Sequence, residues 1–329
     1  MIAPDPYVIL SALLLDLALG DPRWLPHPVA MIGRLINRLE MLLRPEKGRE
    51  YISVTVKQLV SRERAAGILL LLITVASAAG AAWLLLFTAS LVSGPVEFLL
   101  AVATSWTCLA ARSLHAESAL VSDALVAGEI EQARHFLSYI VGRDTADLDE
   151  PEIWRALVET VAENSSDGII APLFWLTVGG PVAAIAFKAV STLDSMVGYR
   201  NQRYLHFGWA SARMDDLLNF IPARLTALLM IVSALPAGLS MTGAFMITLR
   251  DRLKHPSPNS AHPEAAAAGA LGVRLGGVSN YAGVTSIKQY IGDPHQPLDR
   301  RAYNGMIRLM YASTLLMTVV CMAALVAIK

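Results

Sequence analysis

Residues 67–96 read GILLLLITVASAAGAAWLLLFTASLVSGPV, and none of them is Asp, Glu, Lys or Arg. A helix needs about 20 consecutive apolar residues to cross a bilayer, so this stretch is long enough to span it. Ser93-Gly94-Pro95 interrupts the stretch, and a second uncharged run follows at 98–111. The sequence therefore predicts two transmembrane helices joined by a short turn.

The composition of the whole chain is that of a membrane protein. Of its 329 residues, 54% are hydrophobic and only 16% are charged, whereas soluble domains carry about 25% charged residues. Because the formal net charge is zero, the chain lacks the basic balance that nucleic-acid binding requires, and we expect no nucleic-acid partner. Cys108 and Cys321 lie in apolar segments, which predicts neither a disulfide framework nor a cysteine metal site.

Two further segments are predicted to cross the membrane. Residues 306–328 supply one clear span. Residues 7–19 supply a short first span, and Asp5 and Asp16 distinguish it from a cleaved signal peptide.

Two other apolar segments contain helix breakers. Gly179-Gly180-Pro181 divides residues 169–187, and Pro236 with Gly238 divides residues 220–249. Each segment is predicted to form a broken or re-entrant hairpin, or a single kinked span. The expected fold class is therefore all-α: a polytopic integral membrane protein with a single membrane domain over residues 1–329.

The polar segments between the spans set the expected orientation. Lys and Arg number nine in residues 20–64, four in 188–220 and eight in 250–308. Short basic loops stay in the cytoplasm, so these segments are predicted to face it. Segment 112–168 is assigned to the same side from the number of membrane crossings predicted before it. This predicts a multi-pass protein of the cell inner membrane whose chemistry faces the cytoplasm.

One acidic motif follows Pro151, which is typical of a helix start. Glu159 and Glu163 are four residues apart, so on a helix they share one face and repel each other. A Mg²⁺ ion would remove this repulsion, and the alternative is a solvated acidic face. Asn164 and Asp167 are predicted to form a turn into the apolar hairpin.

A second acidic motif surrounds the next polar segment. Lys188 emerges directly from an apolar run, where it either binds phosphate or reaches the membrane interface. Asp215 and Asn219 share a helix face, with Asp216 beside them. These residues predict a second set of Mg²⁺ ligands, and the alternative is the start of an amphipathic helix.

A proline-rich loop forms the third motif. Residues 255–264 read HPSPNSAHPE, a rigid segment that enters a helix with Pro263 in its first turn. Such a helix start is suited to anions, and the loop offers Ser257, Asn259, Ser260 and His262 as donors, with Arg274 further on. The alternative is that the His-Pro pairs only shape an ordinary loop and bind no ligand. The chain contains neither a Walker-type phosphate loop nor a dinucleotide-binding glycine motif.

Four motifs in a fixed order carry a family resemblance. They are GDPRWLPHPV at 20–29 with IGRL at 32–35, and the segments 159–175, 188–200 and 255–277. Together they resemble the cobalamin-biosynthesis membrane proteins of the CbiB/CobD type, the adenosylcobinamide-phosphate synthases. The resemblance extends from about residue 7 to residue 328.

The resemblance implies an ATP-dependent amide ligase. Such enzymes join adenosylcobyric acid to (R)-1-amino-2-propanol or its O-phosphate, and release ADP and phosphate. A carboxylate is a poor electrophile, so ATP is expected to convert it to an acyl phosphate, with Mg²⁺ offsetting the phosphoryl charge. The expected cofactors are ATP and Mg²⁺, the corrinoid is a substrate, and other late corrinoid-pathway membrane proteins are expected partners.

This chemistry assigns hypothetical roles to the polar residues. Acid, base and oxyanion roles fall to Glu163, Asp167, Asp194 and His262. Substrate or phosphate binding falls to His27, Asn164, Lys188, Arg200, Arg213, His255, Ser257, Asn259 and Arg274. Metal binding falls to Glu159, Glu163, Asp215 and Asp216.

Two other functions fit a membrane protein of this composition. A corrinoid carrier or transporter would also use broken hairpins, although such proteins usually show inverted repeats and no internal repeat is evident here. A non-catalytic scaffold of the same fold would have lost the chemistry, and the retained polar motifs argue against it. ATP binding separates the ligase from the scaffold, and substrate consumption separates it from the carrier.

Overall fold

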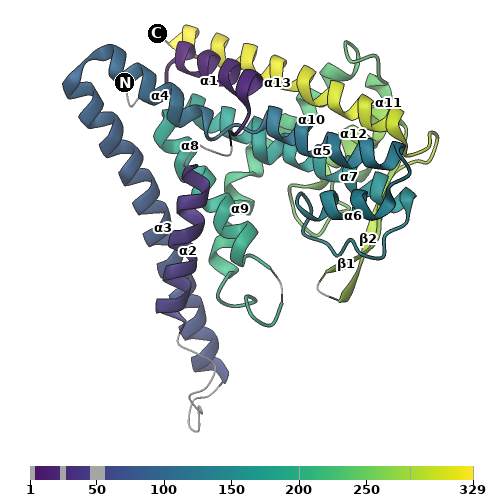
Figure 1. Ribbon diagram of the computed structural model, residues 1–329, viewed down its shortest axis with the longest axis horizontal. Coiled ribbons are helices and arrows are strands. Elements are labelled where there is room, and N and C mark those ends of the chain that lie inside the picture. The colour runs from purple at the N-terminus through teal and green to yellow at the C-terminus, as the bar shows by residue number, and fades with distance from the viewer. Residues whose placement is uncertain (1–3, 23–26, 45–55, 200, 282, 329) are drawn as a thin grey trace.

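The computed structural model describes residues 4–22, 27–44, 56–199, 201–281 and 283–328. These residues form a largely helical protein with one small β-hairpin (Figure 1). The helices are α1 (Pro6–Leu19), α2 (Pro28–Leu43), α3 (Val56–Val92), α4 (Gly94–Trp106), α5 (Ala111–Val126), α6 (Ile130–Ser138), α7 (Glu150–Ser165), α8 (Ala171–Val197), α9 (Trp209–Leu218), α10 (Phe220–Ala234), α11 (Met241–Asp251), α12 (Ala261–Leu271) and α13 (Arg300–Ile328). A π-helical turn, η1 (Ser166–Ile170), joins α7 to α8, and β1 (Arg274–Tyr281) pairs with β2 (Val284–Gly292).

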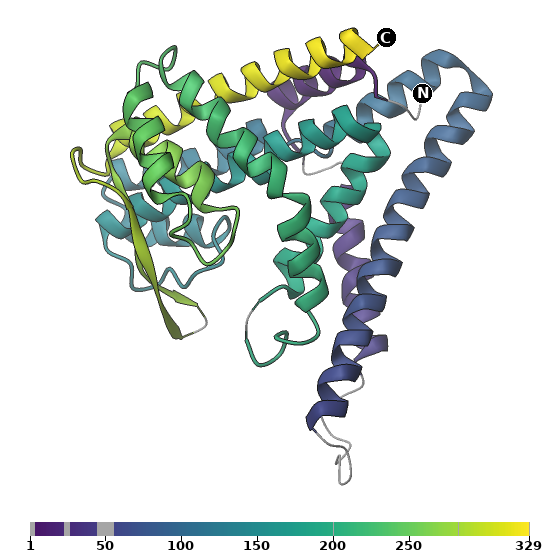
Figure 2. The same ribbon diagram turned by 180° about the vertical axis from the view of Figure 1, so that it is seen from behind.

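The helices form two arms below a shared upper layer (Figures 1 and 2). One arm consists of α2, α3, α9 and the second half of α8, which pack against one another. The other contains α5, α6, α7, α12 and the hairpin. Helices α1 and α13 lie along the top, and both chain ends are on the same side.

The spans expected around residues 67–96, 98–111 and 306–328 are confirmed, and the short first span expected at 7–19 is not among the helices long enough to cross. Among the described residues, four helical segments are long and apolar enough to cross a bilayer: Gln58–Val92, Gly94–Val126, Glu150–Val197 and Arg300–Ala327. A fifth arises if α9 and α10, bent by 43° at their junction, count as one span. The 14-residue α1 is apolar but shorter than these spans. The chain is thus a multi-pass membrane protein.

The helix breaks occur at the predicted residues. Ser93 ends α3 and caps α4, because its Oγ accepts the Val96 N–H at 3.4 Å. Gly180 has a φ of 67°, which only glycine adopts readily, and α8 bends there (Figure 2). Gly238, with a φ of 71°, turns the chain between α10 and α11. Asp16, the charge inside the first apolar run, lies at a helix end and caps α5 by accepting the Ala111 N–H.

The turn predicted at residues 164–168 is wrong. The chain stays helical from α7 through η1 into the first half of α8, and the Ala171 N–H donates to the Ser166 carbonyl, the i to i+5 pattern of a π turn. A π turn satisfies the backbone within the helix, so no loop is needed there, and such turns are frequent at functional sites.

The β-hairpin is the element that the all-α expectation missed. Its strands are antiparallel, with Val278 opposite Ile287. Arg155 of α7 holds β1 in place through hydrogen bonds to the carbonyls of Gly276 and Val278, the latter at 2.8 Å. The hairpin is therefore fixed beside α7, the helix that carries Glu163.

Helix α12 lies in the centre of its arm and is buried along its whole length. It packs closely on α11 through two glycines: a Cβ on Gly269 would lie 2.2 Å from the Gly243 carbonyl oxygen. Small residues permit such close helix contacts in membrane proteins. This packing fixes the loop that joins α11 to α12, and that loop carries His255.

Candidate functional site

A cavity of about 270 Å³ lies where four parts of the chain meet. These parts are the α7–η1 junction, the end of α8, helix α9 and the loop between α11 and α12. Its acidic lining consists of Glu163, Asp167, Asp194, Asp215 and Asp216, and its other polar lining residues are Asn219, His255, Ser257, Asn259 and Ser260. The three predicted motifs thus contribute to one cavity.

Gly198 leaves room for one of the carboxylates. A Cβ on Gly198 would lie 1.9 Å from Asp194 Oδ1, and the Gly198 N–H donates to the Asp194 carbonyl at 2.7 Å. The end of α8 therefore places the Asp194 side chain against bare backbone at the cavity wall.

Helix α9 supplies the opposite wall. Asn219 Nδ2 donates to Asp215 Oδ2 at 3.0 Å, so these residues share a helix face as predicted. Arg213 points outward: its side chain is 66% exposed and lies 3.9 Å from Asp216 Oδ2. The structure brings Asp215 and Asp216 into the cavity, whereas Arg213 is not among its lining residues.

The loop before α12 is held by hydrogen bonds within itself. His255 Nδ1 accepts the Ser257 N–H at 3.0 Å, and Ser257 Oγ accepts the Asn259 N–H at 3.2 Å. Further bonds attach the loop to both walls: Asn259 donates to the Asp216 carbonyl at 2.8 Å, and Ser260 Oγ donates to Glu163 Oε1 at 2.7 Å. Asn259 and Ser260 therefore attach the loop to the two acidic walls of the cavity.

The cavity is strongly electronegative. Five carboxylates line it, and no Lys or Arg is present among its described lining residues. Like charges at such close range repel one another, and a bound cation lowers that repulsion.

Three buried polar atoms in the cavity wall also have no hydrogen-bond partner among the described residues. They are Asp215 Oδ1, Asn219 Oδ1 and His255 Nε2. Carboxylate and amide oxygens are ligands that Mg²⁺ prefers. Within the described residues no three His, Cys, Asp or Glu side chains are close enough to hold a metal by themselves. The residues fit a Mg²⁺ ion that takes its other ligands from phosphate and water.

The two histidines of the loop region are neutral at pH 7. Burial, together with the nearby Lys288, lowers the pKa of His255 to about 4. Because His255 Nδ1 accepts a hydrogen bond, the neutral ring carries its proton on Nε2, which is available as a donor. Burial and the cations Arg224 and Arg252 lower the pKa of His262 to about 4, but His262 is not among the cavity residues.

Two predicted residues of α7 have other partners. Glu159 Oε2 lies 2.5 Å from Arg143 Nη2, and Glu159 Oε1 accepts the Gly276 N–H at 2.7 Å. Asn164 donates to the Thr160 carbonyl at 2.9 Å. Neither lines the cavity, and their roles in binding metal and substrate stay predictions.

Three further predicted residues, Arg274, His27 and Lys188, also lie apart from the cavity lining. Arg274 stacks on Tyr290, with its Cζ 4.3 Å from the ring centroid. His27 Nδ1 caps α2 by accepting the Val29 N–H, and its Nε2 lies 3.3 Å from Asp21 Oδ1. Lys188 is half-buried in α8. Arg200 lies outside the described residues.

One charged residue beside the site, Lys288 of β2, is absent from the predicted set. Burial alone would lower its pKa, but Glu264, Tyr281 and Glu163 raise it. Burial in turn raises the pKa of Glu264, and Glu163 adds to this. The β-branched and aromatic run from Val284 to Ile291 was the available signal of a strand.

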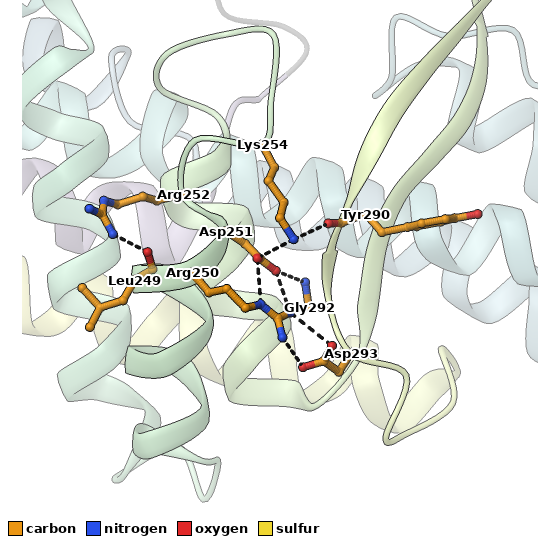
Figure 3. A network of polar contacts seen from close by, with 8 residues as sticks. All are labelled: Leu249, Arg250, Asp251, Arg252, Lys254, Tyr290, Gly292 and Asp293. Carbon is orange, nitrogen blue, oxygen red and sulfur yellow. Dashed lines mark hydrogen bonds and ion pairs between the residues drawn. The ribbon is translucent and has the colours of Figure 1, made fainter.

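An ion-pair network attaches the hairpin to α11 (Figure 3). The fully buried Asp251 accepts hydrogen bonds from Arg250 at 2.8 Å and from the Gly292 N–H at 2.8 Å, and Lys254 Nζ lies 2.6 Å from it. Arg250 also reaches Asp293 at 2.9 Å. The network fixes the end of α11, from which the His255 loop continues.

The fold and the site define a multi-pass helical membrane protein with one acidic cavity built from segments far apart in the sequence. Residues 9–310 match the profile of the family described as CobD/Cbib protein. The chain belongs to this family. No solved structure shows significant similarity to it.

Several curated relatives are similar in sequence to this chain along almost its whole length. A protein of Pelobacter propionicus is 64% identical over 98% of this chain and 96% of its own length. A protein of Geobacter metallireducens is 58% identical over 94% and 93%, and one of Clostridium tetani is 43% identical over 95% of each. All three are named cobalamin biosynthesis protein CobD.

Proposed function

We propose that this chain is an ATP-dependent ligase of cobalamin biosynthesis that forms an amide between adenosylcobyric acid and (R)-1-amino-2-propanol or its O-phosphate. The family membership supports the pathway. The acidic cavity, with Asp215 Oδ1 and Asn219 Oδ1 lacking partners among the described residues, supports the reaction class. A cavity of this charge is suited to the Mg²⁺ complex of a nucleotide.

The proposed reaction has two steps. A corrinoid carboxylate oxygen attacks the γ-phosphorus of ATP, the bond to ADP breaks, and an acyl phosphate forms. The nitrogen of the amine then attacks the acyl carbon, the carbon–oxygen bond to phosphate breaks, and the amine loses one proton. The products are the amide, ADP, phosphate and a proton.

The cavity residues supply what these steps need. Asp215 and Asn219 would supply oxygen ligands to Mg²⁺, which when bound would offset negative charge on the phosphoryl group, and Glu163 and Asp216 add acidic groups to the same cavity. Asp167 and Asp194 supply carboxylates to accept the amine proton. The neutral His255 presents its Nε2–H as a donor to the oxyanion, a contribution of about 10²–10³ in rate for such groups.

The size of the cavity limits which part of the substrates enters. Pockets for drug-sized ligands have volumes of about 300–1,000 Å³, and this cavity has about 270 Å³. We therefore expect only the reacting carboxylate, the amine and the terminal phosphate to enter it. The corrinoid ring remains outside, at the mouth of the cavity. The basic loop segments support placing this mouth on the cytoplasmic side of the inner membrane.

The test is a coupled assay with the detergent-purified chain. It contains adenosylcobyric acid, Mg²⁺ and ATP, with aminopropanol, with its phosphate or with neither, and the corrinoid is followed by mass. The proposal expects ADP and an amide-linked corrinoid only when an amine is present. Tight corrinoid binding without ADP or product would contradict it and favour a carrier.

A further inference from the structure

Arg301 and Arg308 line a second cavity, outside the acidic site. It has a volume of about 220 Å³ and lies between the start of α13, the loop before it and the turn that joins α10 to α11. The turn contributes Leu239, and the end of α12 contributes Leu271. The cavity therefore combines an apolar wall with two guanidinium groups.

The charges of this cavity are not balanced within the described chain. Neither Arg301 nor Arg308 makes an ion pair with a described acidic residue, whereas the neighbouring Arg300 lies 3.2 Å from Asp123. Asp299 also lines the cavity, and its Oδ1 accepts the backbone N–H groups of Arg301 and Ala302. Two cations and one anion leave a net positive charge.

Arg301 and Arg308 are both exposed and lie in the first turns of the helix Arg300–Ala327. They are two helical turns apart and therefore share one face of that helix. Charged residues within spans are rare and usually pair with an opposite charge or reach the interface. Leu239 lies against Gly305, between the two arginines in sequence, so the apolar wall directly adjoins the charged one.

Exposed apolar side chains lie on the turn that contributes Leu239 and on the helix that follows it. Leu235, Met241 and Phe245, on α10–α11 and their turn, are 69%, 43% and 48% exposed. In a protein that crosses the membrane, such a surface contacts lipid. Lipid headgroups at such a surface carry phosphate, an anion that guanidinium groups bind.

We propose that this cavity binds the headgroup phosphate of an anionic membrane lipid. Arg301 and Arg308 contact the phosphate, and Leu239 and Leu271 contact the adjoining apolar part of the lipid. Arg is suited to this role because its planar guanidinium binds phosphate through two donors. The site is separate from the acidic cavity, and its test does not depend on ligase activity.

The test counts lipids bound to the full-length chain in detergent by native mass spectrometry. Phosphatidylglycerol is the probe, and phosphatidylcholine is the zwitterionic comparison. Wild type is expected to retain phosphatidylglycerol at lower concentration than phosphatidylcholine. The double variant Arg301→Gln with Arg308→Gln is expected to weaken phosphatidylglycerol binding by roughly tenfold or more.

Two controls make the result decisive. Arg300→Gln removes a neighbouring guanidinium that is paired with Asp123, and it is expected to bind phosphatidylglycerol as wild type does. The double variant with Lys at both positions keeps the charge and should retain part of the preference. Equal retention of the two lipids by wild type, or unchanged binding by the double Gln variant, would overturn the proposal. Binding of inorganic phosphate without a preference for phosphatidylglycerol would also overturn it and identify free phosphate as the ligand.

Discussion

Asp215 shows how a single residue links the charge of the cavity to its proposed chemistry. Its Oδ2 accepts a hydrogen bond from Asn219, while its buried Oδ1 has no partner among the described residues. A buried carboxylate beside other carboxylates destabilises the fold, and such arrangements are typical of functional sites.

Asp215→Asn is therefore expected to lower activity and preserve stability. The amide keeps the size of the side chain and removes one negative charge from the cavity. ADP release should fall about 100-fold, and the melting temperature should stay constant or rise. The matched control is Asp123→Asn, an exposed residue of α5 that pairs with Arg300. A variant at Asp215 with normal turnover at limiting Mg²⁺ would exclude this residue from metal binding.

Gly198→Ala tests the placement of Asp194. The new Cβ would lie 1.9 Å from Asp194 Oδ1 and 2.6 Å from the Asp194 carbonyl oxygen, so the carboxylate and the end of α8 must both shift. The turnover number is expected to fall at least about tenfold. Gly94→Ala is the control, because a Cβ there meets nothing within 4 Å. Equal activity of the two variants would show that Asp194 does not need this position.

The sequence identified the acidic residues but not how they combine. The i,i+4 rule paired Glu159 with Glu163, yet Arg143 and Gly276 bind Glu159, and Glu163 lines the cavity with Asp194 and Asp215. Spacing along a helix shows which residues share a face. It contains no information on which distant segment packs against that face.

The β-hairpin and α11 form a unit through Asp251. This residue has no exposed surface and binds Arg250, Lys254 and the Gly292 N–H. These partners hold the pKa of Asp251 well below its usual range, although burial alone would raise it. The contact between the hairpin and α11 therefore depends on one buried carboxylate, whose negative charge is balanced by Arg250 and Lys254.

Asp251→Asn should destabilise this unit strongly. Removal of one partner from a buried ion-pair network costs about 3 kcal/mol, because Arg250 and Lys254 lose their common anion. Chemical denaturation in detergent measures the loss. Asp293→Asn, at the 38% exposed end of the same network, is expected to cost less than about 1 kcal/mol. Similar losses in both variants would contradict the assignment of Asp251 as the centre of the network.

His262 makes the stability of α12 depend on pH. Its folded-state pKa of about 4 lies below its ordinary value of 6.5, so the unfolded chain binds the proton first as the pH falls. The contribution of the neutral histidine is complete above pH 6.5 and is lost between pH 6.5 and pH 4, by up to about 3 kcal/mol.

His262→Gln is accordingly expected to flatten the fall in melting temperature between pH 6.5 and pH 4. His135→Gln, at an exposed position of α6, is the control and should follow the wild-type curve. Parallel curves for wild type and His262→Gln would contradict the burial of a neutral ring at this position.

At the scale of elements, the places where helices break could be predicted from the sequence, whereas the π turn and the β-hairpin could not. Gly and Pro marked the ends of α3, the bend in α8 and the turn after α10, because their backbone preferences are local. The π turn at Ser166–Ile170 and the hairpin have no such local cause. They form because α7, α12 and the strands pack together, which is a tertiary effect.

At the scale of the whole molecule, the two arms explain why one cavity contains residues from position 163 to position 260. Helices α8 and α9 carry Asp194 and Asp215 from one arm, and α7 with the α12 loop carries Glu163 and Ser260 from the other. Hydropathy predicted the membrane class because bilayer thickness sets span length directly. It did not predict this convergence, which depends on how the helices pack.

The most direct measurement of the central claim follows the carboxylate oxygen of the corrinoid. Adenosylcobyric acid labelled with ¹⁸O in its reacting carboxylate is incubated with the chain, Mg²⁺, ATP and the amine, and the phosphate released is analysed by mass. Activation through an acyl phosphate predicts one ¹⁸O in inorganic phosphate for each amide formed. Label found in AMP, or amide formed with unlabelled phosphate, would contradict the account.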